Sequence, residues 1–136
     1  MGVIEFPWRL WFFVDGGQTV INQWLNGIEA PEPDRAKLRA LLDIYKFNGM
    51  RAIASVVEDI GDELFAIVSR RKGGLSLGPI FCRGPFSDTE ITFLQGAVWK
   101  GEAQRPYSAK GSALENLEQL RIDHRRRRYE RISAGT

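Results

Sequence analysis

The stretch from Pro79 to Pro106 constrains the fold more than any other part of the chain. It contains two apolar segments, GPIFCRGPF and ITFLQGAVWKG, that are joined by a short polar turn. Segments of this composition, bounded by Gly and Pro, are typical of β-strands, and a short turn makes them antiparallel neighbours. Each strand delivers one cation, Arg83 and Lys100. Cations on strands have a fixed geometry, which suits a site for the phosphate groups of a polyanion.

The remaining periodicities predict a scaffold for these two strands. We expect an aromatic strand over 8–14, a helix over 18–28 that ends near Gly27, and a second helix over 34–46. Residues 48–60 are compatible with either a short helix or an irregular strand. Strands are expected over 63–69, 75–82 and 91–99, and Ser112 and Glu115 form a capping box at the start of a last helix. The fold class is therefore α/β (α+β), an antiparallel sheet with two N-terminal helices and a C-terminal helix, in the order β-α-α-β-β-β-α.

Composition excludes several classes of protein. The chain has 136 residues, enough for one domain with a core of its own. It contains no apolar run near the length of a membrane helix. Its one cysteine, Cys82, cannot form an internal disulfide, and a reducing cytoplasm fits best. One histidine, His124, and scattered carboxylates offer no metal-ligand spacing, so neither a metal nor another cofactor is expected.

The positive charge is concentrated in the second half of the chain. Residues 1–69 contain 6 Lys/Arg and 10 Asp/Glu, a net charge of −4, whereas residues 70–136 contain 13 and 7, a net charge of +6. Such a division suggests an acidic scaffold and a basic half that meets nucleic acid or an acidic partner. The alternative is solvated surface charge together with a basic tail that has no specific role.

Short patterns in this order resemble the RelE/HigB-like toxins of bacterial type II toxin–antitoxin systems, especially their phage-derived branch. The patterns are spread over roughly residues 8–122: VINQWLNGI, RAKLRALLDIY, ELFAIV, IFCRGPF, ITFLQGAVWKG and RPYSAKGSALENLEQL. The resemblance implies a small toxin domain over residues 1–124 and a basic tail over residues 125–136. It also implies a helix-turn-helix antitoxin as partner.

Many members of that family bind the ribosome and cut messenger RNA in its decoding site. The implied chemistry is attack of a ribose 2′-hydroxyl on the adjacent phosphate without a metal, which leaves a 2′,3′-cyclic phosphate and a 5′-hydroxyl. By this resemblance Arg83 and Lys100 are the catalytic cations that hold the phosphate and stabilise its developing charge. The chain departs from the family at Val68, where many relatives have an arginine, and Arg70 or Arg71 would have to replace it.

Other residues are candidates for contacts to RNA. Arg70, Arg71, Lys72 and Arg105 could bind the sugar–phosphate backbone, and Tyr107 could stack on a base or simply pack beneath the last helix. The run Arg125, Arg126, Arg127 and Arg128 would attract ribosomal RNA. It could equally dock an acidic antitoxin surface or be an exposed tail.

Simpler interpretations stay open for the two catalytic candidates. Arg83 could be a strand-end arginine paired with Asp88 or Glu90, and Lys100 a solvated strand-end lysine. Two alternative functions follow: a non-catalytic nucleic-acid- or protein-binding module on the same scaffold, or a relative that acts on DNA gyrase.

Overall fold

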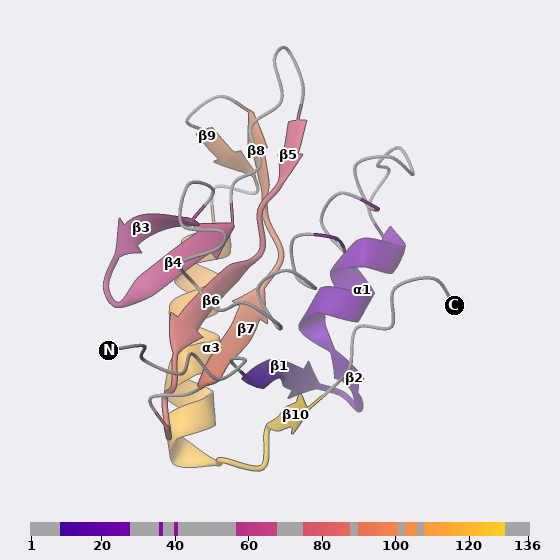
Figure 1. Ribbon diagram of the computed structural model, residues 1–136. Helices are drawn as coiled ribbons and strands as arrows, with labels where there is room; N and C mark the ends of the chain where they lie inside the picture. The colour runs from indigo at the N-terminus through magenta and orange to yellow at the C-terminus, as the bar shows by residue number, and fades with distance from the viewer. Residues whose placement is uncertain are drawn as a thin grey trace, which may run out of the picture.

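The computed structural model describes residues 9–27, 57–67, 75–87, 90–100, 103–105 and 108–129, together with Ala36 and Ala40 (Figure 1). Within these ranges the elements are β1 (Arg9–Asp15), β2 (Gln18–Thr19), α1 (Val20–Gly27), β3 (Val57–Gly61), β4 (Leu64–Ile67), β5 (Leu75–Leu77), β6 (Ile80–Arg83), β7 (Glu90–Gln95), β8 (Val98–Lys100), β9 (Ala103–Arg105), α3 (Ala109–Ile122) and β10 (Arg127–Tyr129). No helix among the described residues has the length and apolar character needed to cross a membrane.

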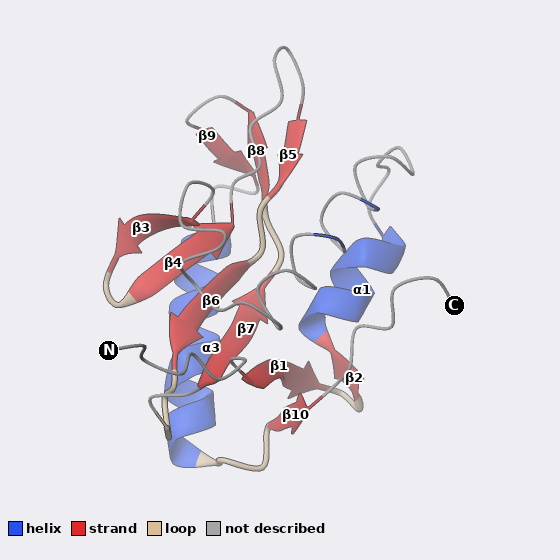
Figure 2. Cartoon of the chain, viewed as in Figure 1, coloured by secondary structure: helices blue, strands red, loops and turns tan. Residues whose placement is uncertain are grey.

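The strands form two sheets. The main sheet has 7 strands in the order β10-β1-β7-β6-β4-β3, with β2 paired to β1. Only the β1–β7 pair of this sheet is parallel; the others are antiparallel. A second sheet of 3 strands, β5-β8-β9, extends beyond one end of the main sheet (Figure 2). The class is thus mixed α+β with a mostly antiparallel sheet.

The predicted element order is not matched. Two helices are found among the described residues, and the structure has more and shorter strands than expected. The second predicted helix, over 34–46, lies outside the described residues except for Ala36 and Ala40, which are helical. Within the ambiguous stretch 48–60, residues 57–60 belong to strand β3, so the strand alternative is correct for them.

Two predicted strands are each divided by a bend. The stretch 75–82 separates into β5 and β6 at Gly78 and Pro79, and the stretch 91–99 separates into β7 and β8 at Gly96 and Ala97. These bends face each other, because the Gly78 N–H donates to the Ala97 carbonyl at 2.8 Å. The two strands therefore leave the main sheet together and continue as the second sheet.

Each face of the main sheet buries its own apolar cluster. On one face, Phe13, Leu64, Ile80 and Leu94 pack with residues of α3. On the other face, Leu10, Phe12, Phe81 and Phe93 pack with α1. The residues of α1 that pack there are those that the sequence predicted on one helical face: Val20, Ile21, Trp24 and Leu25. Alternating side chains of one strand supply both clusters, as the period of two in a β-strand requires. Ile28, the last residue of the predicted helical face, lies outside the described residues.

Helix α3 begins earlier than predicted. Its first residue is Ala109, and the Ser112 N–H already donates to the Ser108 carbonyl at 2.9 Å, so Ser112 lies inside the helix and does not cap it. Ser108 occupies the cap position without a side-chain capping hydrogen bond. The predicted stripe is confirmed in burial, because Leu117 and Leu120 are buried and Leu114 packs against them.

Gly96 sets the distance between α1 and the sheet. A Cβ atom at this position would overlap the indole ring of Trp24. We expect Gly96→Ala to lower the free energy of unfolding by about 1–3 kcal/mol, the usual cost of overpacking a core. Gly111→Ala is the matched control: its Cβ would meet nothing within 4 Å in α3, and alanine there should raise stability by roughly 0.5–1 kcal/mol. Denaturant midpoints of the two variants that shift in the same direction would contradict this account.

Candidate functional site

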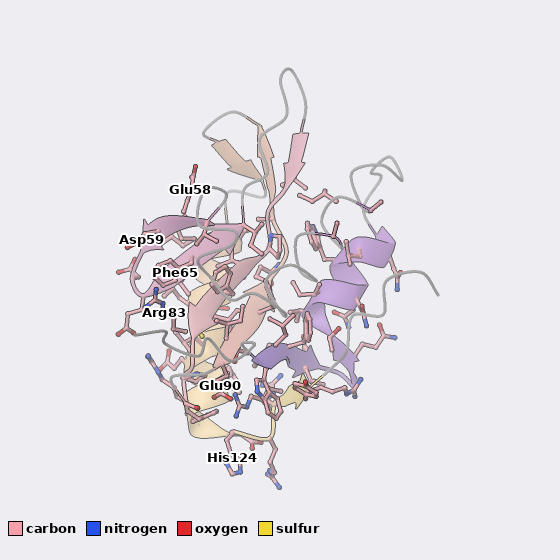
Figure 3. All side chains as sticks on the ribbon, in the orientation of Figure 1. Glu58, Asp59, Phe65, Arg83, Glu90 and His124 are labelled. Atoms are coloured by element: carbon pink, nitrogen blue, oxygen red, sulfur yellow. The ribbon has the colours of Figure 1, made fainter. Side chains whose placement is uncertain are left out.

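Arg83 is the last residue of β6 and is exposed. It pairs with Ile91 at the start of β7, and its guanidinium lies 5.5 Å from the centroid of the Phe65 ring. Figure 3 shows the two side chains next to each other, where β4 begins and the antiparallel strand β6 ends. Glu90, one of the two carboxylates considered as its partner, pairs with Arg127 instead. Asp88, the other, lies outside the described residues, and Arg83 has no ion pair among those described.

A cavity of about 430 Å³ lies beside Arg83. Strand residues Phe65 and Arg83 contribute to its lining, and Leu117 and Arg121 contribute from α3, near the end of that helix. Two further lining residues come from turns, Glu63 and Phe86. We call this site the Arg83 cavity. Its described lining carries two guanidiniums and one carboxylate, which is a net positive charge suited to an anion.

Glu63 reaches the cavity from the tight turn between β3 and β4. Its Oε2 accepts a hydrogen bond from Arg121 Nη2 at 2.9 Å. Both turn residues have left-handed backbone, with φ of 56° at Asp62 and 67° at Glu63, which residues other than glycine rarely adopt. Lys110 braces the same turn: its Nζ donates to the Ile60 carbonyl at 2.6 Å and lies 3.0 Å from Asp62 Oδ2.

The loop over residues 84–87 contributes Pro85 and Phe86 to the lining of the cavity, and Glu90 holds this loop in place. The Phe86 N–H donates to Glu90 Oε1 at 3.2 Å, and the Gly84 N–H donates to the Glu90 carbonyl at 2.8 Å. Thr92 Oγ1 donates to the Gly84 carbonyl at 2.7 Å. This buried network fixes the loop against β7, and so it positions the Phe86 ring at the cavity.

Glu90 is also one half of a buried ion pair. Its Oε1 lies 2.7 Å from Nη1 of Arg127, and the two side chains are only 5% and 12% exposed. Nη1 makes no hydrogen bond, so charge attraction holds the pair more than a directed bond does. The Arg127 guanidinium lies between two rings, 3.9 Å from the centroid of Trp11 and 4.6 Å from that of Phe86.

The other three arginines of the basic run also have partners. Arg125 forms an ion pair with Asp123 at 3.0 Å; its side-chain hydrogen bond lowers the pKa of Asp123, and the same hydrogen bond raises the pKa of Arg125. Arg126 lies 3.3 Å from Asp15 and over the Phe13 ring, and Arg128 donates to the Gly17 carbonyl at 3.2 Å. Much of the charge of the run is therefore compensated within the protein.

Lys100 is the last residue of β8, in the second sheet. Arg83 pairs with Ile91, which precedes Lys100 by nine residues, or about 30 Å along an extended strand. The backbone thus places the two predicted catalytic residues in different sheets, at opposite ends of the paired strands. The nine residues along the strand separate the two, and the tertiary structure adds that the chain changes sheet between them, at Gly96 and Ala97.

Several candidates cannot be placed. Among the predicted RNA contacts, Arg70, Arg71, Lys72 and Tyr107 lie outside the described residues, as does Val68. Arg105 is the last residue of β9, but only its backbone is described, and the same holds for Lys100. His124 is exposed, and its ring meets that of Phe86 edge-on with centroids 6.3 Å apart.

Three residues that line the site were not predicted from the sequence, Glu63, Phe86 and Arg121. Glu90 was considered only as an ion-pair partner of Arg83 and not as the residue that holds the loop. No local pattern distinguishes them, because each acts through a partner distant in the chain. Within the described part of the chain, no group of three or more His, Cys, Asp or Glu could hold a metal ion. No family model, curated protein or solved structure matches the chain, so the resemblance to RelE/HigB-like toxins is supported by its residues alone.

Replacing Arg127 should lower the stability of the protein far more than replacing the exposed Arg125. We expect Arg127→Ala to lower the free energy of unfolding by about 3–5 kcal/mol, because it leaves the Glu90 charge buried without a partner. Arg125→Ala removes the same charge from a solvent-exposed pair and should leave the denaturant midpoint almost unchanged. Equal midpoints for the two variants would show that the buried pair contributes nothing.

Cys82 should make stability fall at alkaline pH. Burial raises the pKa of its thiol from 9.0 to about 11. The folded protein therefore keeps the proton over a pH range in which the unfolded chain loses it, and the free energy of unfolding decreases as pH rises from 9 towards 11. Denaturation of wild type and Cys82→Ala between pH 8 and pH 11 checks this. A stability difference between them that does not change with pH would contradict it.

Proposed function

We propose that the chain is the toxin of a type II toxin–antitoxin system, a metal-independent endonuclease that cuts messenger RNA on the ribosome in the cytoplasm. A helix-turn-helix antitoxin would be its partner. The observation that carries the proposal is Arg83, an exposed cation at the end of a strand, which shares a cavity with Arg121 and the rings of Phe65 and Phe86.

The element order of the family is part of the same proposal. With a helix over 34–46, the succession β1, α1, second helix, β3, β4, β6, β7 and α3 contains the order β-α-α-β-β-β-α, with one additional strand. The strands β2, β5, β8, β9 and β10 are then additions to this scaffold.

The chemistry requires alignment and charge stabilisation more than any cofactor. Attack of the 2′-hydroxyl increases negative charge on the phosphate oxygens, and guanidiniums held in a preorganised site stabilise that charge. Arg83 would contact the phosphate through its planar fork of donors. Arg70, Arg71, Lys72 and Arg105 would bind the flanking backbone and Tyr107 a base, whereas the arginines of the basic run contribute less because of their partners within the protein.

One observation favours the alternative of a binding module without catalysis. The backbone positions of Arg83 and Lys100 are not those of two cations on one phosphate. A protein that kept only the Arg83 end would bind RNA and leave it intact.

Induced expression distinguishes the two functions. If the endonuclease proposal is correct, expression arrests growth, and primer extension finds new 5′-hydroxyl ends in messenger RNA. Arg83→Ala should relieve the arrest and lower cleavage by roughly 10²–10³-fold, the usual effect of removing one donor from such a site. Lys100→Ala should relieve it as well if that side chain reaches the phosphate.

Lys37→Ala is the charge-matched control, since it removes one cation from the acidic half of the sequence. Arrest that persists in both Arg83→Ala and Lys100→Ala would refute the site. Binding of RNA by the wild type with no new RNA ends would identify the non-catalytic module.

A further inference from the structure

We infer that the Arg83 cavity binds one phosphodiester group of single-stranded RNA between Arg83 and Arg121, and that Glu63 is the carboxylate which this phosphate displaces from Arg121. The choice of RNA depends on the proposed function. The exchange of one anion for another at Arg121 depends only on the geometry of the cavity.

The two cations come from different elements and meet at the same cavity. Arg83 ends β6, and Arg121 belongs to the last turn of α3, which packs on that strand. Arginine presents its donors in a planar fork that matches two oxygens of a phosphate. Two such forks that line one cavity could both contact the same phosphate, which would fix its orientation.

The ion pair between Glu63 and Arg121 is weak enough for an anionic ligand to displace Glu63. The side chains of this pair are 54% and 75% exposed, and ion pairs of such exposure contribute little because water screens them. A phosphodiester offers Arg121 a bidentate, charge-assisted contact, and Arg83 adds a second one. The Glu63 carboxylate therefore takes the position at Arg121 that the anionic oxygens of the ligand would take.

The backbone at Glu63 is an independent sign that this residue has a role. Asp62 and Glu63 form a two-residue hairpin turn with positive φ at both positions, where Asn-Gly is the usual choice. Residues that retain such a conformation cluster at functional sites. Lys110 holds the turn through Asp62 and Ile60, so the backbone of Glu63 stays beside Arg121 while its side chain is free to rotate away.

The rest of the lining suits a nucleotide better than a free phosphate ion. Arg127 lies over one face of the Phe86 ring, yet Phe86 is still 46% exposed, which leaves surface for contact with a base. A volume of about 430 Å³ lies within the range of small-ligand sites and exceeds what a single phosphate needs. Cys82 adds no competing negative charge, because burial raises the pKa of its thiol to about 11.

The test measures affinity without cleavage. The probe is a fluorescent RNA hexamer with 2′-O-methyl groups, which cannot supply the attacking hydroxyl, titrated into the full chain by anisotropy. Arg83→Ala and Arg121→Ala should each weaken binding by roughly tenfold or more, as expected for a lost charge-assisted hydrogen bond. Glu63→Gln should tighten binding by roughly two- to fivefold, because the competing carboxylate is removed.

Glu115→Gln is the matched control. It removes the same charge from an exposed position on α3 that does not line the cavity, so it measures the nonspecific effect of one fewer carboxylate. An equal gain in Glu63→Gln and Glu115→Gln, or weaker binding by Glu63→Gln, would overturn the exchange of anions. Unchanged affinity in Arg83→Ala and Arg121→Ala would overturn the site.

Further measurements with other ligands distinguish this inference from the proposed function. A DNA hexamer of the same sequence that binds as tightly as the RNA would overturn RNA as the ligand. Inorganic phosphate should compete only weakly; competition at the affinity of the hexamer would overturn the nucleotide. If an unmodified RNA is bound with the expected pattern of variants but never cut, the endonuclease proposal fails and the binding site stands.

Discussion

The structure depends on the buried ion pair between Glu90 and Arg127. Each charge alone would be costly to bury, so the two side chains pair with each other, and the Arg127 guanidinium also lies over the rings of Trp11 and Phe86. Because Glu90 starts β7 and Arg127 starts β10, the pair reaches across β1 and fastens strand β10 to the sheet. The same carboxylate holds the loop that positions Phe86. The edge of the sheet and one wall of the cavity are thus stabilised together.

This arrangement changes what the basic segment can do. A run of four arginines in a sequence suggests a free positive field, yet each of these arginines contacts a carboxylate or a carbonyl of the protein itself. An anion approaching that surface competes with partners already in place. The Arg83 cavity differs at Arg83, which has no ion pair among the described residues, whereas Arg121 has a partner in Glu63. The free guanidinium of Arg83 among the described residues is therefore the electrostatic reason for proposing the cavity, and not the basic run, as the phosphate site.

The bend shared by the two central strands decides the rest of the site. Gly78 and Gly96 lie where paired strands leave one sheet for another, and Gly96 is also where Trp24 of α1 packs on the backbone. The sequence shows an apolar run through this point, because both halves of the bent strand are apolar. It does not show that β7 and β8 belong to different sheets, and the family resemblance assigned Lys100 to the same phosphate as Arg83. The sequence shows a glycine at position 96, but it does not show that Trp24 packs against it.

Local pattern located the extended segments of the hairpin, though not the division of each into two strands. It was sufficient for the apolar face of α1, the stripe of α3 and the position of Arg83 at a strand end. Each of these follows from period, turn residues or composition within a short window of sequence. Pairing between residues far apart in the chain was decided only by the tertiary structure: Glu90 with Arg127, Glu63 with Arg121, Trp24 with Gly96. Such pairs depend on how the elements pack. The sequence offers several carboxylates as partners for each arginine, and only the packing determines which one lies close enough. The positions of the arginines could be read from the sequence, whereas the contacts that neutralise their charge could be found only in the folded structure.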